Sequence, residues 1–126
     1  MCGLWGAASS FLSVDEMYNV GMLGYLNYFR GKDATGMAIA DYADEGINYS
    51  FIKSIKPSHA FLNDEVVHKW FKNQSAPTAM IGHTRAATFG DLGKANAHPF
   101  HFKDIIGAHN WCFTAFSKKE DPRSDT

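Results

Sequence analysis

The segment from Cys2 to Ala8 constrains the fold of this chain more than any other, because it places core material at the very start. Its residues are small and apolar, and they include Leu4 and Trp5. A short apolar run of this kind predicts a buried strand. We therefore expect a buried strand at the N-terminal end of the chain.

Helix and strand signals alternate along the rest of the chain. Ser13 and Glu16 form a capping-box pattern, which predicts a helix from there to about Phe29. The apolar residues of this helix are spread widely, so we expect it to be well buried. A second helix is expected to be capped by Asn63 or Asp64. Further strands are expected at residues 36–42, 47–52, 78–83 and 104–110.

The order of these elements favours a mixed fold with hairpins. Strands that follow one another at hairpin-like spacing indicate an α+β or layered arrangement and not a regular series of parallel β-α-β units. A length of 126 residues suits a single domain, residues 1–126. The sequence contains no Gly-x-Gly-x-x-Gly phosphate loop, so no nucleotide and no other cofactor is expected.

Composition and charge exclude several classes of protein. Hydrophobic residues make up 45% and aromatic residues 14% of the chain, which is enough for a packed core. The net charge of −1 and the scattered lysines provide no basic face for nucleic acid. No stretch approaches the roughly 20 apolar residues of a membrane helix, and no signal peptide is recognisable. Cys2 and Cys112 could pair, but without a secretory signal we expect reduced thiols in a cytoplasmic protein.

Met1, Cys2 and Gly3 form the first candidate for chemistry. If an aminopeptidase removes Met1, the thiol and the free α-amino group of Cys2 lie on the same residue. An α-amino group titrates near about 7.7–8.0 and a cysteine near about 8.5. The neutral amine can therefore accept the thiol proton, directly or through a water. This arrangement supplies a nucleophile and a base without a histidine. The alternative is a Cys that follows the initiator Met by chance.

Two further polar residues stand where predicted strands end. Arg85 follows an apolar strand, where a buried guanidinium suits bidentate capture of a carboxylate. The alternative for Arg85 is a salt bridge with Asp33 or Asp91. Asn110 ends the last predicted strand, and its side-chain amide can donate to a developing oxyanion. The alternative for Asn110 is a turn residue.

A third group of side chains has the spacing of a metal site. His98 and His101, followed by His109 and Cys112, could hold a zinc ion. Pro99 makes a helical face of the first pair improbable, and the ligands would come from loops. Structural histidines are the more frequent outcome, so no metal is expected.

Five motifs together resemble the glutaminase domain of class II glutamine amidotransferases, the type with an N-terminal nucleophile. The resemblance covers about residues 2–110. The motifs, in chain order, are Cys-Gly at 2–3, Arg-Gly-Lys-Asp-Ala-Thr-Gly at 30–36, Gly-His-Thr-Arg-Ala-Ala-Thr-Phe-Gly at 82–90, Ala-His-Pro-Phe at 97–100 and Gly-Ala-His-Asn at 107–110.

This resemblance implies a fold and a reaction. The fold would be a four-layer αββα sandwich with two antiparallel sheets. Cys2 would attack the side-chain amide of glutamine, form a γ-glutamyl thioester and release ammonia to a synthase domain on another chain. Asn110 and the backbone N–H of Trp111 would stabilise the oxyanion. The resemblance assigns glutamine binding to Arg85, Thr88, His83 and Asp125, and a structural role to Arg30 and Asp33.

The sequence differs from the family pattern at three points. Trp111 stands where the family has a glycine, and Asp125 lies in a shortened acidic motif at the end of the chain. The sandwich would also be incomplete at its C-terminal end, and open sheet edges would favour an oligomer. The alternative to an active enzyme is a catalytically impaired relic of the fold that acts as a binding or regulatory module.

Overall fold

The computed structural model of the chain describes residues 1–43, 46–88 and 90–110. A four-stranded antiparallel sheet has the order β1-β4-β2-β3, and a separate hairpin pairs β5 with β6. The strands are β1 (Gly3–Ala8), β2 (Ala34–Ala43), β3 (Gly46–Ser54), β4 (Ala79–Arg85), β5 (Phe100–Phe102) and β6 (Ile105–Gly107). The helices are α1 (Val14–Leu26), α2 (Ser58–Leu62) and α3 (Glu65–Lys72), with short 3-10 turns η1 (Asn27–Arg30) and η2 (Lys94–Asn96).

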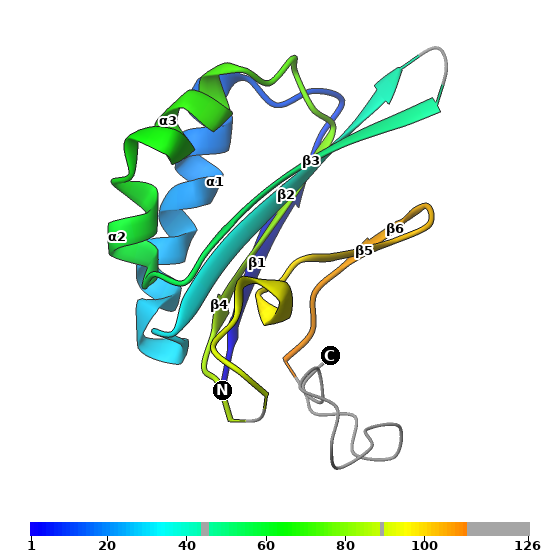
Figure 1. Ribbon diagram of the computed structural model, residues 1–126. Coiled ribbons are helices and arrows are strands. Elements are labelled where there is room, and N and C mark those ends of the chain that lie inside the picture. The colour runs from blue at the N-terminus through cyan, green and yellow to red at the C-terminus, as the bar shows by residue number, and fades with distance from the viewer. Residues whose placement is uncertain (44–45, 89, 111–126) are drawn as a thin grey trace.

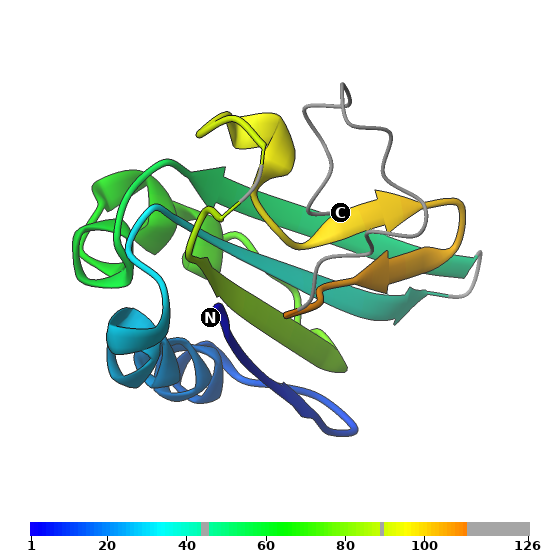
Figure 2. The same ribbon diagram turned by 90° about the horizontal axis from the view of Figure 1, so that it is seen from below.

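The helices and the small hairpin lie on opposite faces of the four-stranded sheet. In Figure 1, α1, α2 and α3 cover one face, and β5 and β6 run along the other; Figure 2 shows the same separation. The fold is therefore mixed α and antiparallel β, as the sequence predicts. The αββα layering remains a prediction. Within the described residues, no helix is long and apolar enough to cross a membrane.

The core lies between the helices and the sheet. Trp5, which the first strand contributes, is 8% exposed, and the cluster around it draws on both layers. Its members are Trp5, Leu12, Met17, Met37, Ile39, Phe61, Leu62, Val67, Phe71 and Met80. β1 is an edge strand with one face on this core, so Trp5 is buried while Leu4 is 49% exposed. The predicted N-terminal strand is confirmed, but of its six residues only Gly3 and Trp5 are buried.

The capping box at the start of α1 is confirmed. The Ser13 hydroxyl accepts from the Glu16 N–H at 3.2 Å, and the Ser13 N–H donates to the Glu16 carboxylate at 2.8 Å. The helical conformation also extends about as far as predicted, since η1 continues α1 to Arg30, but the predicted burial is wrong. α1 stops at Leu26, which is 72% exposed, and the 3-10 turn that follows leaves Phe29 84% exposed. Only one face of α1 meets the core, where Met17 is fully buried.

Removing the cap should weaken the fold measurably. We expect Ser13→Ala to lower the free energy of unfolding by about 1 kcal/mol, because the first turn of α1 loses the acceptor for a backbone N–H. Urea denaturation measures this difference. Ser10→Ala, at an exposed position just before the cap, is the matched control. Equal losses in the two variants would contradict the role of the capping box.

The local sequence signals predicted α3 but not the short elements α2 and β5. α3 begins as predicted, because Asp64 caps it by accepting from the Val66 N–H at 3.0 Å. The sequence pattern did not indicate α2, whose N-cap is Pro57. The strand expected at 104–110 extends only over Ile105–Gly107, and its partner β5 was not expected. Strands of three residues depend on their pairing, Phe100 opposite Gly107, more than on their own composition.

Candidate active site around Cys2

Cys2 lies beside the end of β4. β1 and β4 are antiparallel with Gly3 opposite Thr84, so the N-terminal end of β1 meets the C-terminal end of β4, as Figure 1 shows. The Cys2 sulfur accepts from the Ala86 N–H at 3.3 Å and approaches the Ala86 carbonyl at 3.8 Å. The thiol is partly buried. A backbone donor therefore points at the sulfur from the residue that follows Arg85.

Asn110 comes to the same place from the other end of the described chain. The backbone N–H of Cys2 donates to the Asn110 side-chain oxygen at 2.7 Å, across 108 positions of sequence. The Asn110 side-chain oxygen faces the Cys2 N–H. The other branch of the Asn110 amide is its Nδ2 group, which is a hydrogen-bond donor. The structure thus brings together the predicted nucleophile and the predicted oxyanion residue.

Arg30 and Asp33 hold the backbone around the sulfur. Arg30 Nε donates to the Cys2 carbonyl at 3.0 Å. The Asp33 carboxylate accepts from the Ala87 N–H at 2.7 Å, and the Asp33 N–H donates to the Arg85 carbonyl at 3.0 Å. One side chain therefore fixes the main chain of the nucleophile, and the other fixes the turn that carries the Ala86 N–H. These contacts agree with the structural role expected for both residues.

A glycine makes this close approach possible. A Cβ at Gly31 would lie 2.5–2.7 Å from main-chain atoms of Thr84 and Arg85. Backbone atoms cannot yield as a flexible side chain can, so any larger residue would push the turn away from the end of β4. Gly31 therefore allows Arg30 and Asp33 to reach opposite sides of the site.

Arg85 is buried and organises the loop beyond β4. It is 1% exposed, and its Nη1 donates to the main-chain carbonyl of Asp91 at 2.8 Å. The Asn96 side-chain amide donates to the same carbonyl at 3.1 Å. Thr88, in this loop, is exposed. Binding of glutamine by Arg85 and Thr88 remains a prediction, and the contact with Asp91 uses its main chain and not its carboxylate.

Three histidine rings, of His83, His98 and His109, pack against one another in tilted and edge-to-face contacts, and this group is called the histidine stack. His83 on β4 and His98 after η2 have ring centroids 4.0 Å apart, and His98 and His109 are 4.6 Å apart. His83 and His98 are 1% and 2% exposed. Gly36 in β2 allows this packing, because a Cβ there would collide with the His98 carbonyl oxygen. The stack connects the central sheet to the segment that carries Asn110.

Of the residues in the zinc alternative, His98 and His109 belong to this stack and His101 does not. His101 is exposed and contacts Tyr49, with ring centroids 4.6 Å apart. Cys112 lies outside the described residues, as do Trp111 and Asp125 of the predicted site. Among residues 1–43, 46–88 and 90–110, no group of three or more His, Cys, Asp or Glu could hold a metal ion.

Burial keeps the rings of His83 and His98 neutral. It lowers the pKa of His83 to about 4 and that of His98 to about 2. The positive charges of Arg85 and Lys53, together with the neighbouring rings of His83 and His109, lower the pKa of His98 further. The unfolded chain therefore binds protons that the folded chain does not, between the ordinary histidine value of 6.5 and these lowered values.

Stability should consequently fall in acid. The two histidines contribute stability that is present above pH 6.5 and is lost as pH falls toward about 4 for His83 and about 2 for His98. The loss is at most about 1.4 kcal/mol per pH unit for each histidine. We expect His98→Phe, which retains an aromatic ring, to reduce this slope. Urea denaturation between pH 4.5 and 7 (a window of about two units) measures it. Identical slopes in wild type and variant would contradict the prediction.

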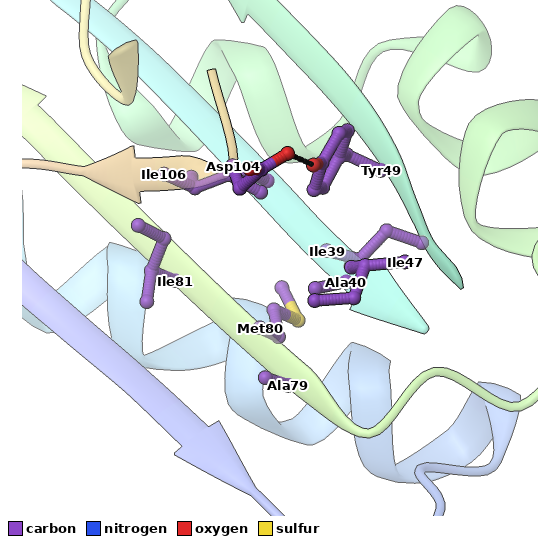
Figure 3. A pocket seen from close by; sticks show the side chains of 10 residues that line it. Ile39, Ala40, Ile47, Tyr49, Ala79, Met80, Ile81, Asp104 and Ile106 are labelled. Carbon is purple, nitrogen blue, oxygen red and sulfur yellow. Dashed lines mark hydrogen bonds between the residues drawn. The ribbon is translucent and has the colours of Figure 1, made fainter. Parts of the chain in front are cut away.

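Away from Cys2, a pocket of about 230 Å³ lies between the four-stranded sheet and the β5–β6 hairpin. Figure 3 shows its lining, mostly apolar, with Tyr49 donating to the Asp104 carboxylate at 3.4 Å. The β4 residues in its wall are Ala79, Met80 and Ile81. These residues lie at the start of β4, whereas Cys2 lies beside its end. The pocket is therefore separate from the candidate active site around Cys2.

One contact of the site left no signal in the sequence. The Ala86 N–H that reaches the Cys2 sulfur is a main-chain group, and the identity of its side chain does not reveal it. The only cue available was its place directly after Arg85 in the motif at 82–90. His83, which the motif also contains, packs against His98 and contacts the His109 carbonyl.

Comparison with known proteins gives two similar relatives, and no protein-family model matches the chain. Both relatives are named glutamine–fructose-6-phosphate aminotransferase (isomerizing). The protein from Halalkalibacterium halodurans is 35% identical over 100 residues, which cover 79% of this chain and 14% of the relative. The protein from Buchnera aphidicola is 28% identical over 82 residues, or 65% of this chain and 12% of the relative. The chain thus matches about an eighth of each relative's length.

Proposed function

We propose that this chain is a single glutaminase domain, residues 1–126, of the class II glutamine amidotransferase type. It hydrolyses the side-chain amide of glutamine and delivers ammonia to a synthase partner. The observation that carries the proposal is the contact between Cys2 and Asn110 at the end of β4, where the Cys2 nitrogen lies 2.7 Å from the Asn110 side-chain oxygen. The similarity to enzymes named for glutamine and amino transfer supports it.

The first half of the proposed reaction makes a thioester. With Met1 removed, the Cys2 amine takes the thiol proton, and the sulfur attacks the amide carbon of glutamine. The negative charge on the amide oxygen is stabilised by Asn110 Nδ2, which points away from the amine, and by the backbone N–H of Trp111. The C–N bond then breaks, and the departing nitrogen takes the proton from the Cys2 ammonium. Ammonia and a γ-glutamyl thioester are formed.

The second half restores the enzyme. The Cys2 amine takes a proton from a water molecule, whose oxygen attacks the thioester carbon. The C–S bond breaks, the sulfur regains the proton, and glutamate leaves. Arg85 holds the α-carboxylate of glutamine in this proposal, Thr88 shapes the loop around it, and Asp125 binds the α-amino group. The αββα layering and a synthase partner on another chain belong to the same proposal.

Direct turnover and covalent capture test the function together. Protein whose intact mass lacks Met1 is incubated with glutamine, and glutamate and ammonia are measured; asparagine serves as control substrate. A diazoketone analogue of glutamine should then add once per chain, at Cys2 and not at Cys112. A folded chain that releases no ammonia and forms no adduct would instead be the binding or regulatory module.

A further inference from the structure

His83 is connected to the candidate site through the backbone. Its ring lies on the central strand β4 and is 1% exposed. The His83 Nε2 atom is 3.1 Å from the His109 carbonyl oxygen. That carbonyl belongs to the peptide unit that joins His109 to Asn110. A side chain from the rigid sheet therefore contacts the backbone immediately before the residue whose amide meets Cys2.

The contact defines the tautomer of His83. A carbonyl oxygen only accepts, so Nε2 must carry the hydrogen. The Nδ1 atom is buried, and no hydrogen-bond partner for it exists in the described part of the chain. Burial also lowers the pKa of the ring to about 4, so His83 is neutral at physiological pH. The ring of His98, 4.0 Å away, covers its face and limits its rotation.

We propose that His83 is a positioning residue for Asn110, an assignment that rests on the proposed function. The Nε2–H bond holds the peptide 109–110 and thereby keeps the Asn110 amide oriented toward Cys2. His83 acts through Asn110 in this assignment and does not contact glutamine, in contrast to the binding role that the sequence resemblance implies.

The surrounding fold explains why such a connection is needed. β4 pairs with β1 on one side and with β2 on the other, so its position is well determined. Asn110 follows a hairpin whose two strands have only three residues each. A two-stranded hairpin of this length is marginally stable on its own and depends on contacts with the rest of the fold. An oxyanion donor has to stay within tenths of an ångström of its productive position, which requires support from a rigid element.

Two substitutions separate positioning from packing. His83→Leu removes the donor, and we expect kcat for glutamine hydrolysis to fall by about 10²-fold or more, with KM changed far less. His83→Gln retains an N–H donor at a similar reach, and we expect it to recover most of the lost kcat. His101→Leu, at the exposed histidine outside the stack, is the matched control and should retain full kcat. Retention of kcat in His83→Leu, or equal losses in both His83 variants, would overturn the proposal.

Nitrogen NMR provides a readout that requires no catalysis. In the wild-type chain at neutral pH, we expect His83 to carry its hydrogen on Nε2 and none on Nδ1. We also expect the Asn110 side-chain amide signal to shift in His83→Leu and to return toward its original position in His83→Gln. If the wild-type chain shows these signals but has no glutaminase activity, the proposed function is refuted, whereas the positioning of Asn110 by His83 is supported. A hydrogen on Nδ1 of His83, or an Asn110 signal unchanged in His83→Leu, would sink the positioning role alone.

Discussion

Replacement of Cys2 by alanine is expected to reduce glutamine hydrolysis by about 10⁴-fold or more, to the background rate. Without the sulfur no thioester forms, and no other side chain at the end of β4 is assigned the attack on the amide carbon. The fold should be unaffected. The hydrogen bonds that hold this residue, from its N–H to Asn110 and from Arg30 to its carbonyl, both use main-chain atoms that alanine retains.

The chain's second cysteine provides the control for this experiment. Cys112→Ala removes a thiol of the same kind, and we expect turnover within about twofold of wild type, since the proposed reaction assigns Cys112 no role. Thermal unfolding of Cys2→Ala should match that of wild type, which excludes misfolding as the cause. Full glutamine hydrolysis by Cys2→Ala, or loss of hydrolysis in Cys112→Ala, would show that Cys2 is not the nucleophile and would refute the proposed mechanism.

The sequence predicted those parts of the fold that have local signals. The capping box at Ser13, the Asp64 cap of α3 and the hairpin of β2 and β3 each depend on residues close together in the chain. The burial at the end of α1 was predicted wrongly, because the apolar residues Leu26 and Phe29 suggested a core contact that the structure does not provide. Whether a layer covers such residues is a property of the whole fold and not of the helix sequence.

The candidate site was predictable in its members but not in its connections. Cys2 and Asn110 are separated by 108 positions, and only the resemblance to a family placed them in one site. The contacts that support them are the Ala86 N–H, the Asp33 carboxylate on Ala87 and the His83 ring on the 109–110 peptide. Two of these three involve main-chain donors and the third a main-chain acceptor. Such groups exist at nearly every residue, so only the tertiary structure shows which of them are used.

Retention of Met1 is expected to lower turnover by about 10²–10⁴-fold, the usual contribution of a positioned base. In the chain that keeps Met1, the Cys2 nitrogen is an amide that donates to Asn110 and has no basic lone pair. Removal of Met1 converts the same nitrogen to an amine. Its position next to the sulfur is already determined, because Arg30 holds the Cys2 carbonyl and the Ala86 N–H contacts the sulfur.

Two forms of the same chain make this prediction measurable. Protein made while methionine aminopeptidase is inhibited keeps Met1, and intact mass confirms the fraction that does. Met1 is 81% exposed, so added aminopeptidase should reach it, and glutamate release should rise in proportion to the chains that lose the residue. The same treatment of Cys2→Ala should produce no activity, which separates base formation from contamination by the peptidase. Equal turnover by the two forms would show that the Cys2 amine is not the base and that another group takes the thiol proton.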